Sequence, residues 1–126
     1  MSDLVKTAKD IMSEEVFTVT PDKNLNFVEV ISEAWHIRHI PVIDDQGKPI
    51  AVLSVRDIMR HLSKVGVSHF IPIKEIMSSR LVTASPDTPI SELAHKMQEY
   101  NVSGVPITAD NKIVGMVTER DFLKLF

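Results

Sequence analysis

Two short stretches place a hydroxyl residue, an arginine and an aspartate in the same order after a run of apolar residues. One reads AVLSVRD and spans residues 51–57, and the other reads GMVTERD and spans residues 115–121. A hydroxyl group and a carboxylate three residues apart, where a strand leads into a helix, lie close together at the helix N-terminus. A carboxylate there can accept the two hydroxyl groups of a ribose, and the helix amides can receive a phosphate.

In the second stretch we assign Asp121 to a ribose and Thr118 to a phosphate. Gly115 lies just inside the predicted strand, where the missing side chain lets another group approach the backbone. The alternative is purely structural: Thr118 would cap the helix, and Asp121 would lie in its first turn because the helix dipole favours an acid there. The sequence leaves both interpretations open.

The first stretch offers the same chemistry in Ser54 and Asp57, but Ala51 replaces the glycine. The extra methyl group predicts a narrower or vacant site. If only one of the two sites is filled, we expect it to be the one built on Thr118 and Asp121.

The elements that position these stretches belong to an internal repeat. KDIMSEEVFTVTPD, from Lys9, aligns with KEIMSSRLVTASPD, from Lys74, and HIPVIDD, from His39, aligns with GVPITAD, from Gly104, each pair 65 residues apart. The offset between the two VRD and ERD closings is 64 residues, because the intervening hairpin turn is one residue shorter in the second copy. Repeats of this kind build one structural unit per copy.

Each copy predicts the order β-α-β-β-α, with residues 16–19 and 81–83 as first strands. In the second copy, the helix that follows the first strand has Thr88 as its expected N-cap and Pro89 at its first helical position. Later strands are expected at 40–43 with 50–54 and at 105–108 with 113–118, and a last helix in each copy at the Arg-Asp pair. A copy of this size buries too little apolar surface to fold alone. The fold class is therefore α/β of the α+β type, with two repeats packed face to face as one pseudo-two-fold module.

The repeated DIMS and EIMS openings, the IPV and VPI strands and the S-x-x-D and T-x-x-D closings resemble a tandem pair of cystathionine-β-synthase (CBS) motifs, or Bateman module. The resemblance divides the chain into an N-terminal segment (1–8), motif 1 (9–62), a connector (63–73) and motif 2 (74–126). It implies a regulatory module, without catalysis of its own, that binds an adenosine-containing ligand such as AMP, ADP, ATP or S-adenosylmethionine between the motifs.

The basic residues are shared unequally between the copies. Arg38 and His39 precede the first IPV strand, whereas Ser103 and Gly104 stand at the equivalent places. The pair resembles the phosphate-binding pair in the nucleotide subunit of the energy-sensing kinase, with the order reversed. The candidate phosphate contacts are Arg38, His39, Arg56 and Arg120, and the resemblance adds Pro41 and Pro106 of the two strands to the ligand-binding set. Which copy's ligand Arg38 and His39 serve stays open, and His36 is interpreted as a solvated helix end.

Composition and motifs argue against other functions. The chain of 126 residues has no cysteine, a net charge of −3 and 44% apolar residues, which is typical of a soluble globular protein and not of a general nucleic-acid binder. No phosphate-binding GxxxxGK loop, nucleophile elbow or catalytic triad pattern occurs. His36 and His39 have H-x-x-H spacing, but no carboxylate or further histidine at ligand spacing accompanies them, so we do not expect a metal site. No apolar run is long enough to span a bilayer, so we expect a cytoplasmic protein.

One helical face is apolar in the first copy only. Phe27, Val30, Ile31 and Ala34 form a stripe, and their counterparts are Glu92, His95, Lys96 and Glu99. Leu25, Val28 and Trp35 are expected to supply the inward face, matching Ile90, Leu93 and Tyr100. The stripe therefore predicts a homodimer interface, unless the N-terminal segment with Leu4 and Val5, or the connector, covers it.

Two functions follow from these observations. The first is a CBS-pair sensor that binds an adenosine ligand and regulates an unknown protein partner. The alternative is a dimerisation or protein-interaction module whose ligand clefts are degenerate. Ala51 favours the alternative, and the Thr118 and Asp121 pair favours the sensor.

Overall fold

The computed structural model describes residues 6–64, 66–77 and 81–126. The elements in chain order are α1 (Ala8–Ile11), α2 (Leu25–Trp35), β1 (His39–Ile43), β2 (Pro49–Ser54), α3 (Val55–Leu62), the 3₁₀ turn η1 (Ile73–Glu75), α4 (Ile90–Glu99), β3 (Gly104–Ala109), β4 (Lys112–Thr118) and α5 (Glu119–Leu123). No helix in the described ranges has the length and apolar character needed to cross a bilayer.

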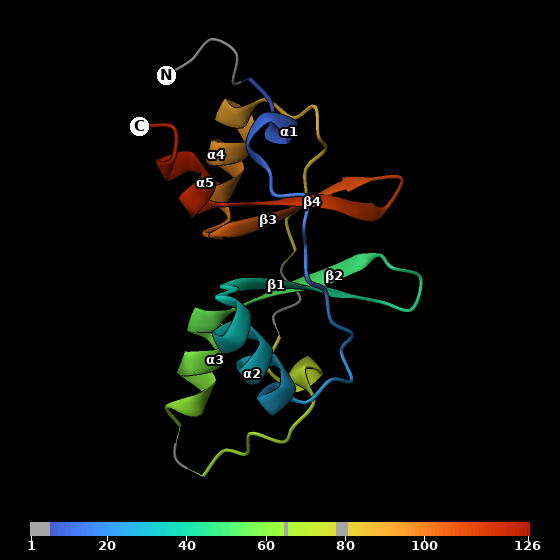
Figure 1. The fold of residues 1–126 in the computed structure, drawn as a ribbon, viewed down its shortest axis with the longest axis vertical. Coiled ribbons are helices and arrows are strands. Elements are labelled where there is room, and N and C mark those ends of the chain that lie inside the picture. Colours follow the sequence, from blue (N-terminus) through green and yellow to red (C-terminus); the bar gives the residue numbers. More distant parts are fainter. Residues whose placement is uncertain (1–5, 65, 78–80) are drawn as a thin grey trace.

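Two antiparallel hairpins, β1–β2 and β3–β4, form the centre of the molecule. Figure 1 shows them stacked, with α2 and α3 beside the first hairpin and α4 and α5 beside the second. The turns carry the positive φ angles that hairpin loops require, at Gly47 in the first copy and at Asp110 and Asn111 in the second. The α+β class and the face-to-face arrangement of the two repeats are confirmed.

The predicted first strand of each copy is wrong in extent. Val19 forms a single parallel bridge to Val42, donating its N–H to the Pro41 carbonyl at 3.1 Å. A longer parallel ladder would need N–H donors from Pro41 on one side and Pro21 on the other, and proline has none. The second copy repeats this arrangement with a bridge from Ala84 to Ile107, between Pro106 and Pro86.

The opening segment of each repeat packs against the other repeat. Ala8 of α1 is buried in the core of the second copy, and its N–H donates to the Thr88 carbonyl at 2.8 Å. Conversely, Ile73 of η1 is buried in the core of the first copy and donates to the Lys23 carbonyl at 2.8 Å. Figure 1 shows α1 near α4 and the connector returning past α2. Because each core contains a segment of the other copy, neither core is complete without both repeats.

Two details of the long helices correct the sequence prediction. The N-cap of α4 is Pro89, not Thr88, because the Thr88 hydroxyl accepts the Ser85 N–H at 3.0 Å in the preceding turn. Trp35 and Tyr100 were expected to face inward, but their side chains are 71% and 47% exposed. Trp35 is the last residue of α2, and Tyr100 is the C-cap that follows α4.

Three of the other predicted inward residues, Leu25, Val28 and Leu93, are fully buried as expected. Ile90, at the start of α4, is only half-buried. Within the part of the chain that the structure describes, the stripe on α2 stays largely exposed, since Phe27 is 40% and Val30 62% exposed, Ala34 is exposed and Ile31 is half-buried. The segment with Leu4 and Val5, named above as an alternative cover for the stripe, lies outside the described residues.

Candidate functional site

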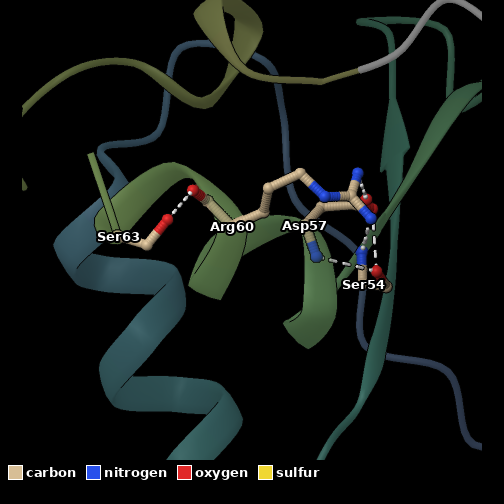
Figure 2. Close-up of polar contacts among 4 residues, drawn as sticks. All are labelled: Ser54, Asp57, Arg60 and Ser63. Carbon is tan, nitrogen blue, oxygen red and sulfur yellow. Dashed lines mark hydrogen bonds and ion pairs between the residues drawn. The ribbon is translucent and has the colours of Figure 1, made fainter.

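Ser54 and Asp57 form a closed capping arrangement at the start of α3. The Asp57 N–H donates to the Ser54 hydroxyl oxygen at 3.1 Å, and Asp57 Oδ2 accepts the Ser54 N–H at 3.0 Å and its hydroxyl at 2.8 Å. Arg60 approaches the other carboxylate oxygen, Oδ1, at 3.6 Å. Figure 2 shows these contacts on one side of α3. The Asp57 carboxylate is thus held rigidly by Oδ2 while Oδ1 faces outward with an arginine.

Thr118 and Asp121 repeat this geometry at the start of α5. Asp121 Oδ2 accepts the Thr118 N–H at 2.7 Å and lies 3.4 Å from its hydroxyl. The structural interpretation of both motifs is therefore correct: the hydroxyl residue is the N-cap, and the aspartate lies in the first turn. Capping uses one oxygen of each carboxylate, so it does not exclude binding through the other.

The first motif faces a cavity of about 950 Å³ between the repeats. From its own repeat the lining includes Ser54, Arg56, Asp57 and Arg60. The second repeat contributes mainly α4 and the segment that follows it. Its lining residues are Val82, Ala94, Met97, Gln98, Asn101, Val102, Ser103, Gly104, Glu119, Phe122 and Leu123. The cavity thus combines two carboxylates, from Asp57 and Glu119, with two guanidinium groups and an apolar wall.

The second motif faces a separate cavity of about 370 Å³. Thr118, Arg120 and Asp121 line it from α5 and its N-cap, and Arg38 lines it from the first repeat. The other lining residues are Ser13, Glu15, Val16, Phe17, His36, Ile37, His39, Met116, Glu119 and Leu123. Arg38 is therefore placed beside the second repeat's motif. His36 ends α2 with a left-handed φ of 56° and is exposed, as expected of a helix end.

His39 lines both cavities. Its Nε2 lies 2.7 Å from the Ser103 hydroxyl, which joins the two repeats. Burial lowers the pKa of His39, and the nearby carboxylates of Glu119 and Asp57 oppose this only in part. The imidazole is therefore neutral at pH 7, with one donor and one acceptor nitrogen.

Gly115 does not serve as an open approach for a ligand. A Cβ on Gly115 would collide with Met12 Sδ and lie 2.8 Å from Met12 Cγ and 3.1 Å from the Ser13 carbonyl oxygen. The glycine accommodates the opening segment of the chain, which pairs with β4 here. Ala51 is fully buried in the first core and lines neither of the two cavities, so the predicted narrowing of that site by its methyl group is wrong.

Pro41 and Pro106 are fully buried and line neither cavity. In the structure they limit the parallel pairing with the first strands, because proline has no N–H to donate, and they are not placed as ligand contacts. Sequence reasoning missed Arg60, Ser103 and Glu119 as lining residues. Ser103 could have been found, because it occupies the position equivalent to Arg38 in the repeat. Among the described residues, no three histidine, aspartate or glutamate side chains are grouped so that they could hold a metal ion.

The CBS domain family model matches residues 8–64 and 73–126. The chain belongs to the CBS domain family. Its CBS pair is similar to a solved CBS domain pair in complex with 5′-methylthioadenosine and S-adenosyl-L-methionine, with a TM-score of 0.86 and 33% identity over 95% of this chain and 98% of the other. The cytosolic domain of the Mg²⁺ channel MgtE, solved with ATP, has a TM-score of 0.79 and 25% identity over 96% of this chain and 49% of the other.

Among curated proteins, L-aspartate semialdehyde sulfurtransferase of Methanocaldococcus jannaschii is 33% identical over 129 aligned positions. The alignment covers all of this CBS pair but only 24% of the relative. The chain therefore spans about a quarter of the length of such enzymes, and their catalytic names do not carry over to it.

Proposed function

We propose that this CBS pair is a regulatory module that binds adenosine-containing ligands in its two cavities. The observation that carries the proposal is the pair of capped aspartates. Each is fixed through Oδ2 at a helix start, and each lines a cavity that also contains arginine side chains from the positions next to it. The outward carboxylate oxygen accepts ribose hydroxyl groups, and the arginines receive a phosphate or another anionic group.

The ligands of similar proteins support this class of compound. One similar CBS pair was solved with 5′-methylthioadenosine and S-adenosyl-L-methionine, and another similar domain with ATP. These ligands share the adenosine group and differ at the 5′ position. The adenosine group therefore defines the proposed class, and the 5′ substituent is what the arginines discriminate.

The regulated partner would respond to a change in the shape or association of the module. The exposed stripe of Phe27, Val30, Ile31 and Ala34 supports a homodimer, because an isologous contact needs a self-complementary apolar patch. The same stripe favours the second candidate function, a dimerisation or interaction module that keeps empty cavities. Ligand binding separates the two candidates.

The test is a thermal-shift screen of AMP, ADP, ATP, S-adenosylmethionine and 5′-methylthioadenosine. A ligand at 100 times its Kd adds about 2.7 kcal/mol to the free energy of unfolding. We expect at least one compound to stabilise the protein and a Asp57→Ala/Asp121→Ala variant to lose the response. If the wild type responds to none of the five, the interaction module is the correct function.

A further inference from the structure

His39 occupies a position that only one of the two repeats can use. It begins β1, and its counterpart 65 residues later, Gly104, begins β3. A Cβ on Gly104 would lie 2.8 Å from His39 Cδ2 and 3.1 Å from its Cγ. Equivalent residues that touch each other lie next to the pseudo-two-fold axis. One imidazole fills the space there, and the second copy has no side chain at that point.

This single ring forms part of the wall of both cavities, together with Glu119 and Leu123. Its Nε2 is engaged by the Ser103 hydroxyl at 2.7 Å, and Ser103 itself lines the larger cavity. Arg38 lies on the side of the smaller cavity, whereas Arg56 and Asp57 lie on the side of the larger one, and Glu119 lines both. A neutral imidazole has one donor and one acceptor nitrogen, so it cannot make the same contacts to both cavities at once.

We propose that His39 couples the two cavities, so that a ligand bound in one weakens binding in the other. The proposal rests on the proposed function, since it concerns the same two sites. A ligand that contacts the imidazole holds it in one orientation and withdraws it from the other cavity. A net hydrogen bond contributes about 0.5–1.5 kcal/mol, which corresponds to roughly a two- to tenfold change in the second Kd. By linkage the effect is the same in both directions.

The experiment measures this factor by calorimetric titration with AMP and with S-adenosylmethionine. Asp57→Ala leaves only the smaller cavity competent, and Asp121→Ala leaves only the larger one, so these variants give the two independent affinities. In the wild type the second binding step should be about two- to tenfold weaker than those values predict. His39→Ala should weaken both sites and remove the coupling, whereas the control Ser63→Ala, on the exposed end of α3, should leave the coupling unchanged.

If His39→Ala does not fold, NMR of the His39 imidazole in proteins that keep this residue provides a second test. The His39 signals, assigned with His39→Gln, should move when ligand is added to either single-site variant. If both cavities bind with independent affinities, or if the ring responds to only one of two occupied cavities, the coupling is overturned and the proposed function stands. If only one cavity binds, the coupling is overturned and the proposed function is reduced to that one cavity. If neither AMP nor S-adenosylmethionine binds the wild type at all, both proposals fall together.

Discussion

Replacing Gly115 with alanine tests whether this glycine serves the fold or a ligand. In the structure, Met12 and Ser13 occupy the space in front of Gly115. The Ser13 N–H and carbonyl form a pair of 2.9 Å hydrogen bonds with the carbonyl and N–H of Met116. A new Cβ would lie 2.8 Å from Met12 Cγ and 3.1 Å from the Ser13 oxygen, well inside ordinary contact. Gly115→Ala should therefore push the opening segment away from β4.

The expected loss can be worked from these contacts. Overpacking a filled site costs about 1–3 kcal/mol. Gly115 does not have a positive φ, so alanine fits the backbone and returns about 0.4–1 kcal/mol through the unfolded chain. Taking the middle of each range, the net destabilisation is about 1.3 kcal/mol in the absence of any ligand, within limits of about 0 and 2.6 kcal/mol. Part of the clash involves the flexible end of the Met12 side chain, so the cost should shrink in a Met12→Ala background.

Urea denaturation followed by circular dichroism gives the free energies of unfolding for wild type, Gly115→Ala, Met12→Ala and the double variant. The matched control is Ala51→Gly at the equivalent place, where the change should cost stability by leaving a small cavity in the first core. A Gly115→Ala protein that is as stable as wild type but binds ligand poorly would refute the structural role and restore the ligand-access interpretation.

Three further predictions follow from the site and the exposed stripe. Asp57→Ala and Asp121→Ala should each remove one of two adenosine-binding steps in calorimetry. The affinity of the altered site should fall about tenfold or more, since a hydrogen bond to a charged group contributes about 1.5–3 kcal/mol. Retention of both steps in either variant would contradict the site. Burial lowers the pKa of His39, so its contribution to stability is complete above about pH 6.5 and is lost as the pH falls below that value. Below this pH, the urea midpoint should decline less steeply with falling pH in His39→Gln than in wild type. Equal pH dependence of the two midpoints would contradict this role of His39. Light scattering should show a folded monomer for Phe27→Glu/Ile31→Lys and a dimer for wild type, and a dimeric variant would move the interface elsewhere.

Much of the fold could be predicted because both copies of the repeat show the same pattern of expected strands and helices. The paired strands, the helices after the Arg-Asp pairs and the variable hairpin turn all follow from local pattern and from the 65-residue offset. The first strands failed because a β-branched run favours extended backbone but does not guarantee a partner. Pro41 and Pro106 deny that partner an N–H, so a single bridge is all that forms. The exchange of α1 and η1 between the cores is a tertiary property that no local pattern indicates.

The candidate site was predicted in part, because its polar residues follow one another in sequence. Ser54, Asp57, Thr118 and Asp121 lie at helix starts by local rules alone, and in the structure each pair lines a cavity, while their binding role stays a prediction. What faces a motif from the other repeat depends on packing. For that reason Arg38 could be nominated from sequence but assigned to the smaller cavity only from the structure.

The difference between the two cavities arises at the pseudo-two-fold axis. A gene duplication would supply two identical sites, and two identical side chains next to the axis would compete for the same volume. Here Gly104 yields that space to His39, and Ser103, which stands where the first repeat has Arg38, accommodates its imidazole with a hydroxyl. The same pair of substitutions leaves Arg38 without a counterpart, so one cavity gains a guanidinium group that the other lacks at this position. These two differences between the repeats at the axis thus place Arg38 in the lining of one cavity only and let one imidazole ring contribute to the walls of both.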